Sequence, residues 1–207
     1  MSFYRRHVLP LLVNCACGAK QIRAQREKIA PRAEGVVLEL GFGGGLNLPF
    51  YDASKVTRLY ALEPEEGMLV RARKAVRKAP MPVEILPERA EALSLPDASV
   101  DTVLVTYALC TIPDPAAALA GARRVLKPGG KLLFCEHGLA PDANVRCMQR
   151  RIEPIWKPLA GGCHLTRDPA ALLTSAGFEI ADIERAYLPG MPRFGGFNYR
   201  GAAVAAG

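Results

Sequence analysis

The chain has 207 residues, half of them hydrophobic and 23% charged, with a formal net charge of +7. This balance excludes an intrinsically disordered chain and suffices for the core of one α/β domain. Its longest apolar runs are far shorter than the roughly 20 residues of a membrane-spanning helix, so we expect no bilayer-spanning segment. No convincing signal-peptide cleavage site follows the first apolar run, and we therefore expect a cytoplasmic protein with its six cysteines reduced.

The positive charge is spread over several parts of the chain. Basic residues gather at 5–28, 71–78, 123–127 and 146–157, and those at 71–78 alternate with apolar residues as on an amphipathic helix. No stripe combines concentrated basic residues with aromatic ones, so we expect no nucleic-acid partner. An anionic membrane surface or an acidic substrate stays open as the reason for the charge.

From Val36 onward, short apolar runs alternate with helical patterns, which is the order of a parallel sheet covered by helices. Asp114-Pro115 and Asp168-Pro169 provide helix starts, while Pro128-Gly129 and Gly177 provide stops. We expect strands at 36–40, 58–62, 83–86, 100–105, 131–135, 178–183 and 199–204, and helices at 65–78, 115–127 and 169–176.

Two segments stand outside this alternation, residues 1–34 and residues 143–165. Ligands of open α/β sheets bind beyond the carboxyl ends of the strands. We therefore expect both segments to cover that edge and to select the substrate. The expected division is an N-terminal helical cap over 1–34 and an α/β domain over 35–207, forming a single domain overall.

A glycine-rich segment follows the first expected strand, with glycines at positions 41, 43 and 45. Glycines at this place let the backbone turn sharply and approach a ligand closely. A dinucleotide fingerprint would place its third glycine at position 46, where this chain has leucine. The spacing therefore argues against nicotinamide and flavin dinucleotides.

Two acidic residues accompany the glycine loop. Glu63 ends the second expected strand, about twenty residues beyond the loop, where a carboxylate can accept both hydroxyl protons of a ribose. Glu39 lies just before the loop and puts a negative charge beside the ligand. Such a charge suits a cationic amino acid and sulfonium better than a pyrophosphate. The loop and the two carboxylates together predict a cationic nucleoside ligand.

Four ordered motifs resemble those of class I S-adenosylmethionine-dependent methyltransferases: VLELGFGGG at 37–45, ALEP at 61–64, AEALSLPDASVD at 90–101 and RVLKPGGK at 124–131. They occur in the order and spacing of that family. The resemblance implies a Rossmann-like, mostly parallel sheet of seven strands with an antiparallel last strand, helices on both faces and an N-terminal helical cap. It also implies S-adenosylmethionine as the methyl donor and S-adenosylhomocysteine as the product.

A narrower similarity runs nearly end to end, through FYRRHVLP at 3–10, LCTI at 109–112, EH at 136–137 and GCHLTR at 162–167. These segments resemble bacterial relatives of the microsomal thiol methyltransferases, a branch near the quinone-biosynthesis methyltransferases. The similarity implies a small, apolar acceptor, with sulfur favoured. Transfer to a quinone or a phospholipid amine at a membrane surface is the alternative. A nucleic-acid-binding protein with a vestigial donor pocket is the hypothesis from another class.

The class I resemblance assigns a donor site to this sequence. It implies that the glycine loop contacts the methionine end of the donor and that Glu63 binds the ribose. Met68 and residues 90–91 would contact the adenine, and the end of the fourth strand would form the floor of the donor site. Phe42 departs from the small residue common in the family, and Arg89 departs from the usual aspartate or asparagine. The full set of expected donor contacts is Glu39, Gly41, Phe42, Gly43, Asn47, Glu63, Pro64, Met68, Ala90, Glu91, Thr106, Tyr107 and Leu109.

Methyl transfer from a sulfonium is an in-line displacement that depends mainly on positioning, so a catalytic base is optional. His137 follows the fifth expected strand at the substrate edge and is the first candidate base, with a packing role equally open. His164, in a glycine-containing segment, is the second candidate. The expected acceptor pocket is lined by Tyr4, His7, Tyr107 and Trp156.

The cysteine spacing does not predict a metal site. Cys15 and Cys17 are separated by one residue and Cys163 precedes His164, but neither pair has the spacing of a structural zinc site. We therefore expect no bound metal. The expected partner is a small-molecule substrate, with peripheral membrane contact left open.

Overall fold

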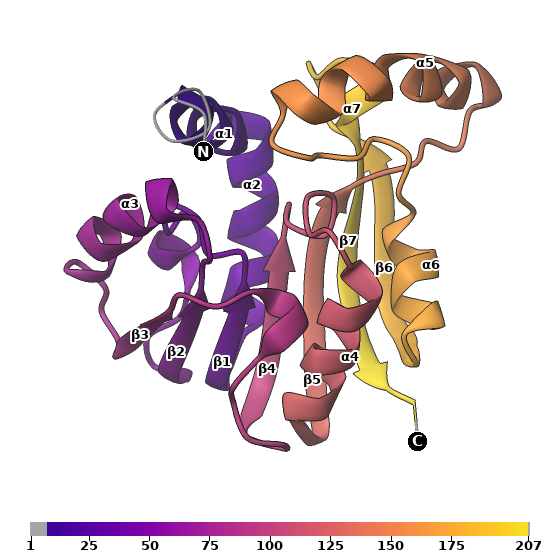
Figure 1. Cartoon of the computed structure of the whole chain (residues 1–207). Coiled ribbons are helices and arrows are strands. Elements are labelled where there is room, and N and C mark those ends of the chain that lie inside the picture. The colour runs from indigo at the N-terminus through magenta and orange to yellow at the C-terminus, as the bar shows by residue number, and fades with distance from the viewer. Residues whose placement is uncertain (1–7, 207) are drawn as a thin grey trace.

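The computed structural model describes residues 8–206 and shows a seven-stranded sheet with helices on both sides (Figure 1). The strand order is β3-β2-β1-β4-β5-β7-β6. The strands are β1 Gly35–Leu40, β2 Val56–Leu62, β3 Val83–Leu86, β4 Val100–Thr106, β5 Leu126–His137, β6 Phe178–Tyr187 and β7 Phe197–Ala205. The helices are α1 Leu9–Cys17, α2 Lys20–Ile29, α3 Glu66–Val76, α4 Pro115–Val125, α5 Ala143–Leu159, α6 Pro169–Ser175 and α7 Arg193–Gly196, with 3₁₀ turns η2 Ala30–Arg32, η3 Leu48–Phe50 and η4 Ala90–Ala92.

This topology confirms the fold expected from the sequence, including an antiparallel last strand. β7 runs antiparallel to both β5 and β6, whereas the pairs formed by β1 to β5 are parallel. The order of strands reverses between β1 and β4, which are hydrogen-bonded neighbours. Ligands of open α/β sheets bind at the carboxyl ends of the strands next to such a reversal. The donor site is therefore expected at the upper edge of the sheet in Figure 1.

Hydrophobic side chains fill both faces of the sheet. One face packs against α4 and α6 through residues such as Leu119 and Leu173, and the other packs against α2 and α3 through residues such as Ile29 and Ala72. Strand β4 lies in the middle and is buried at every position except Asp101. A central parallel strand needs this continuous burial because helices cover both of its faces. The packed core fixes the loops at the strand ends.

Two separate parts of the chain meet above the carboxyl edge of the sheet. Helices α1 and α2 lie at this edge on one side, and α5 and α7 lie there on the other (Figure 1). Helix α2 contacts β5 and β7, and α5 contacts α7. The chain after α5 reaches α1, since the side chain of Leu9 lies next to Gly161. Both segments that interrupt the sequence alternation thus contribute helices near this edge of the sheet.

Some elements are longer than the sequence pattern predicts. β5 begins early because Leu126 already pairs with Val100 of β4. β6 extends to Tyr187 because β7 pairs with it along its whole length. Most of the segment 143–165, for which no element was predicted, forms helix α5. Within residues 8–206, no helix is both long enough and apolar enough to cross a membrane.

Candidate functional site

The glycine loop after β1 adopts a left-handed backbone. Gly41, Gly43 and Gly45 have φ angles of +72°, +59° and +76°. These angles are open to glycine and strained for residues with a side chain. A Cβ atom on Gly41 would lie only 2.6 Å from the Cβ of Ala108. Glycine therefore lets the loop approach the segment that follows β4.

Glu63 lies buried at the end of β2, beside the glycine loop. Its Oε2 accepts a hydrogen bond from the backbone N of Gly43 at 2.7 Å, and its Oε1 accepts one from that of Glu65 at 2.9 Å. Burial raises the pKa of Glu63, and the two backbone hydrogen bonds oppose this rise. A carboxylate offers about four acceptor sites, so capacity for ribose hydroxyls remains. Pro64, the next predicted contact, is exposed.

Glu39 is buried inside the site and is held by neighbouring side chains. It accepts hydrogen bonds from Nδ2 of Asn47 at 2.8 Å and from the hydroxyl of Tyr51 at 2.6 Å. Burial raises the pKa of Glu39 to about 7, although both hydrogen bonds lower it. The carboxylate thus ties the end of β1 to Asn47 and Tyr51, which follow the glycine loop.

Arg26 of helix α2 joins this network, and the sequence analysis missed it. Its Nη1 donates hydrogen bonds to Oδ1 of Asn47 at 2.9 Å and to Oγ1 of Thr106 at 2.6 Å. The guanidinium also lies 5.3 Å from the ring centroid of Tyr107, in cation–π range. Burying an arginine requires such partners.

The sequence around Arg26 resembles a solvated helix, because most of its neighbours in KQIRAQREKI are polar. One feature of the sequence does indicate that Arg26 is buried, namely its spacing from the apolar residues of the helix. Ile22, Arg26 and Ile29 recur at helical spacing, and these are the buried residues of α2. A charged residue on an otherwise apolar helix face is a candidate for a buried polar role. The buried Nε of Arg26 has no hydrogen-bond partner among the described residues.

Of the three residues expected at the adenine, Met68 lies beside the glycine loop, and Ala90 and Glu91 belong to η4. The Cε of Met68 lies 3.4 Å from where a Cβ on Gly43 would stand. Ala90 is buried and Glu91 is partly buried in η4. Arg89, the departure from the family pattern, is exposed and pairs with Glu91 at 3.5 Å. Its side chain is thus directed to a carboxylate of this chain.

Several predicted donor contacts have side chains that point into the protein. Phe42 and Leu109 are buried in the two hydrophobic clusters, so their side chains face the core. Thr106 is buried in the Arg26 network. Tyr107 has a φ of +54°, which is uncommon for a residue other than glycine, and its hydroxyl donates to Oδ1 of Asn198 at 2.7 Å.

The candidate base His137 lies at the end of β5 beside two cysteines. Its Nε2 is 3.2 Å from the Sγ of Cys163, and the Sγ of Cys110 lies within 4.8 Å of both. The hydrogen bond with Cys110, together with those from His137, lowers the pKa of the Cys163 thiol against the effect of burial. The sequence analysis identified His137 without these neighbours, because the three residues come from distant segments.

His164, the second candidate base, is held by helix α5. Its Nδ1 lies 3.1 Å from Oε1 of Glu153. Trp156 packs edge-to-face against Phe194, with ring centroids 5.9 Å apart. The ring of Tyr107 has a different neighbour, the guanidinium of Arg26. The predicted pocket residues Tyr4 and His7 lie outside the described residues.

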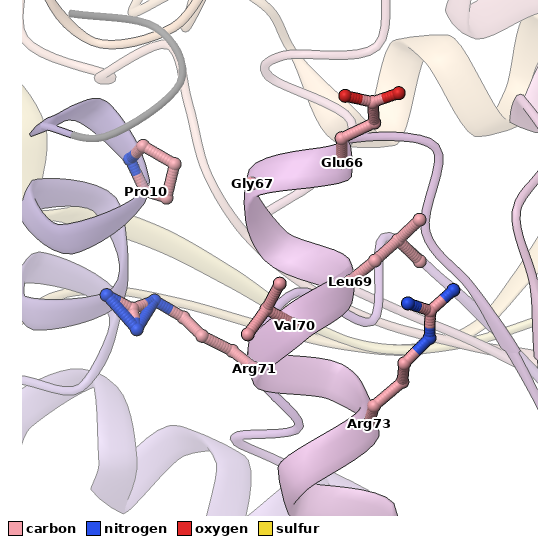
Figure 2. A pocket seen from close by; sticks show the side chains of 7 residues that line it. All are labelled: Pro10, Glu66, Gly67, Leu69, Val70, Arg71 and Arg73. Carbon is pink, nitrogen blue, oxygen red and sulfur yellow. The ribbon is translucent and has the colours of Figure 1, made fainter.

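A surface groove of about 590 Å³ lies between α1 and α3 (Figure 2). Figure 2 shows Arg71 extending from α3 toward α1, below Pro10. The lining contains none of the predicted donor contacts, so we do not assign the groove to the donor. The lining residues are Pro10, Glu66, Gly67, Leu69, Val70, Arg71 and Arg73.

Comparison with known proteins relates this chain to methyltransferases. A family model described as a methyltransferase domain matches residues 38–134. Thiol S-methyltransferase TMT1B of Rattus norvegicus is 35% identical over 153 residues, covering 73% of this chain and 63% of that protein. Phosphatidylethanolamine N-methyltransferase of Cereibacter sphaeroides is 33% identical over 105 residues, covering 50% of this chain and 51% of that protein.

A solved structure of similar fold is a SAM-dependent methyltransferase of Leishmania major, with a TM-score of 0.68 and 17% identity over 97% of this chain and 80% of that one. The fold, the glycine loop and Glu63 define a nucleoside-binding α/β protein. Residues 38–134 belong to a methyltransferase domain family, and the chain is similar over 153 residues to a thiol S-methyltransferase. The methyl donor that this domain and fold imply is S-adenosylmethionine. The matched region is less than two thirds of the length of the curated relatives described above.

Proposed function

We propose that this protein transfers a methyl group from S-adenosylmethionine to the sulfur of a small, apolar thiol. The observation that carries the donor half is the hydrogen bond between Glu63 and the backbone of Gly43, because it holds a buried carboxylate against the glycine loop. The acceptor half is supported by the 35% identity to a thiol S-methyltransferase.

Each part of the donor has a proposed partner in the described site. The ammonium group of its methionine end would lie in the field of Glu39, and its carboxylate would pair with the guanidinium of Arg26. The ribose hydroxyls would donate to Glu63. The adenine would lie between Met68 and residues 90–91.

The reaction joins an anionic sulfur to a methyl group on a cationic one. The thiolate attacks the methyl carbon in line as the bond from that carbon to the sulfonium breaks, and S-adenosylhomocysteine leaves. Opposite charges are neutralised in this step, so a site shielded from water favours it. The thiol proton has to leave first, because the thiolate is the nucleophile. His137, at the end of β5, is the candidate group that accepts this proton.

The donor half is tested by calorimetric titration with S-adenosylmethionine and S-adenosylhomocysteine. We expect micromolar binding by the wild type and its loss in Glu63→Ala and Gly43→Val. The acceptor half is tested with methyl-labelled donor and four acceptors: an alkyl thiol, a phenol, an amine and phosphatidylethanolamine. A methyl thioether and S-adenosylhomocysteine should form in equal amounts. A folded wild type that binds neither nucleoside would overturn the proposal.

A second candidate is transfer to a phospholipid amine or a quinone at a membrane surface. Helix α1 exposes Leu11, and helix α5 exposes Met148 and Ile155. Both helices lie at the carboxyl edge of the sheet (Figure 1). Exposed Arg150 and Arg151 of α5 would face anionic headgroups. The relation to a phosphatidylethanolamine N-methyltransferase favours this candidate as well.

Vesicle sedimentation tests this second candidate. Binding to vesicles that contain phosphatidylserine should weaken in Ile155→Ser and at high salt, because both apolar and charged contacts are lost. Val204→Ser is the control, since Val204 is exposed at the opposite edge of the sheet, where it pairs with Lys131. Vesicle binding that is equal in both variants would contradict docking through α5.

A further inference from the structure

Cys110, His137 and Cys163 form a compact group of metal-binding side chains at the carboxyl edge of the sheet. Their two Sγ atoms and an imidazole nitrogen all lie within 4.8 Å of one another. The Nε2 of His137 and the Sγ of Cys163 are 3.2 Å apart. The spacing of neighbouring cysteines predicted no metal site, whereas these three residues are far apart in the chain: they follow β4, end β5 and follow α5.

The separations agree with those of a tetrahedral zinc site. Zinc binds sulfur at about 2.3 Å and nitrogen at about 2.0–2.1 Å, which places two ligands of a tetrahedron roughly 3.5–3.8 Å apart. The 3.2 Å between His137 and Cys163 is slightly shorter than these values, and the two separations from the Sγ of Cys110 lie within 4.8 Å. Two cysteines and one histidine also form the protein ligand set of a known class of catalytic zinc site.

The backbone holds the ligand segments in place. The backbone N of His164 donates to the carbonyl of Cys110 at 2.8 Å, which ties the loop after β4 to the residue next to Cys163. Arg167 donates to the carbonyl of Ile112 at 2.7 Å and so braces the same loop. Rigid ligands of this kind lose little entropy on binding a metal.

The surroundings of the group contain polar atoms without partners. Cys110 and Cys163 are buried, and Trp156 lies beside Cys163. The Nδ1 of His137 and the Oε2 of Glu136 are buried and have no hydrogen-bond partner among the described residues. Buried polar atoms are normally paired, so these two indicate that a ligand or water belongs here.

We propose that Cys110, His137 and Cys163 bind one Zn²⁺ ion, which keeps a fourth coordination position for the sulfur of the acceptor thiol. The acceptor role rests on the proposed function. His137 is then a zinc ligand, and the zinc takes over its role as the group that activates the thiol.

The chemistry balances without a further reactant. The acceptor thiol binds zinc and releases its proton to solvent, because a coordinating thiol is deprotonated. Its sulfur then attacks the donor methyl carbon, while the carbon–sulfonium bond of the donor and the zinc–sulfur bond break. A methyl thioether and S-adenosylhomocysteine leave, and zinc regains its open position. The reaction requires no external oxidant or reductant.

Cys17 of helix α1 is a further sulfur near the group. Its Sγ is not among the ligand atoms that all lie within 4.8 Å of one another. Burial is the main cause of its raised pKa, and the nearby Cys163 adds to the rise. A bond from Cys17 to zinc would fill the fourth position and leave no place for an acceptor. A Cys17→Ser variant therefore separates an open site from a closed one.

The test measures metal binding by the full chain, purified under reducing conditions and freed of metal with a chelator. Zn²⁺ is titrated in competition with a chromophoric chelator, and Co²⁺ is used as the spectroscopic probe. We expect one equivalent of Zn²⁺ and a sulfur-to-cobalt charge-transfer band. Cys110→Ser, Cys163→Ser and His137→Ala should each weaken zinc binding by more than about 100-fold, beyond the loss expected for a residue outside the ligand shell.

Matched controls keep the test specific. Cys147→Ser should bind zinc like the wild type because Cys147 is exposed on α5. His164→Ala should do the same, since its Nδ1 faces Glu153. Circular dichroism and titration with S-adenosylhomocysteine show whether each variant is folded. Cys17→Ser should keep both the zinc and a change in the cobalt spectrum on addition of an alkyl thiol.

The outcomes that overturn the inference are distinct from those that overturn the proposed function. A folded wild type that binds no stoichiometric zinc would contradict the zinc site. Zinc affinity equal to that of the wild type in the three ligand variants would contradict it as well. Loss of zinc in Cys17→Ser removes the open position. Thiol methylation at full rate in the metal-free protein would contradict the role of zinc but agree with the proposed function. Zinc binding without thiol methylation removes the proposed function alone.

Discussion

The Nη1 of Arg26 donates a hydrogen bond of 2.6 Å to Oγ1 of Thr106, 80 positions later in the chain. This contact joins helix α2 of the N-terminal segment to the carboxyl end of β4. The same nitrogen reaches Asn47, which in turn donates to Glu39. The N-terminal segment thus contributes a buried charge to the donor edge in addition to covering it.

Replacing Arg26 by methionine tests this connection. Arg26→Met leaves the acceptor on Asn47 without its donor, so we expect the free energy of unfolding to fall by about 2–3 kcal/mol. Affinity for S-adenosylhomocysteine should fall as well, because the proposed partner of its carboxylate is lost. Urea denaturation and calorimetry measure the two effects.

Arg23→Met is the matched control on the same helix. Arg23 is exposed and pairs with Glu27 one turn away, so its loss should cost about 0.5 kcal/mol or less. Equal stability and affinity in the two variants would show that the Arg26 network contributes nothing specific.

The role of Glu63 in ribose binding is tested by Glu63→Gln. The amide is close to the carboxylate in shape but lacks its charge and one of its acceptor atoms, so affinity for S-adenosylhomocysteine should fall by about 10- to 100-fold. Glu65→Gln should bind normally, because Glu65 contributes its backbone N to the contact with Glu63. A dissociation constant unchanged in Glu63→Gln would contradict the assignment.

The need for glycine at position 41 is tested with three alanine substitutions. Gly41→Ala meets both a positive φ and a contact with Ala108, so we expect a loss of more than about 2 kcal/mol and of nucleoside binding. Gly129→Ala has the positive φ but free space around the Cβ, and should cost about 1–2 kcal/mol.

Gly195→Ala is the third member of this series and has neither problem. Its stability should equal that of the wild type within about 0.5 kcal/mol. Thermal unfolding ranks the three variants. If Gly41→Ala were no worse than Gly129→Ala, the close approach of the glycine loop to β4 would not matter for stability.

The pH dependence of stability tests the burial of Glu39. Its pKa is raised to about 7 in the folded protein, mainly by burial. The folded state therefore binds the proton more tightly than the unfolded one, and stability falls as pH rises from the usual carboxyl pKa to about 7. Glu39→Gln should remove up to about 3 kcal/mol of this decline. Urea unfolding of both proteins between about pH 5 and pH 8 measures the difference.

Glu34→Gln is the control for this series. The pKa of Glu34 is lowered, first of all by its hydrogen bond with Lys131, so its contribution disappears only at more acidic pH. The variant should follow the wild-type slope above about pH 5. A Glu39→Gln slope identical to that of the wild type would mean that the carboxyl is not desolvated.

Much of the fold and the local features of the candidate donor site could be predicted from the sequence. The alternation of apolar runs and helical patterns predicts the central strands, because parallel strands buried on both faces need apolar residues throughout. The glycine loop and Glu63 are also local features, since each directly follows a strand whose carboxyl end must lie at the binding edge.

The tertiary structure decides the groups that come from distant parts of the chain. Arg26 was missed because its role depends on α2 docking against the sheet, and the cysteine pair around His137 was missed because Cys110 and Cys163 follow different elements. The inward direction of Phe42 likewise depends on packing. Spacing along a chain reports local geometry, whereas the meeting of these side chains depends on how the whole sheet and its covering helices pack.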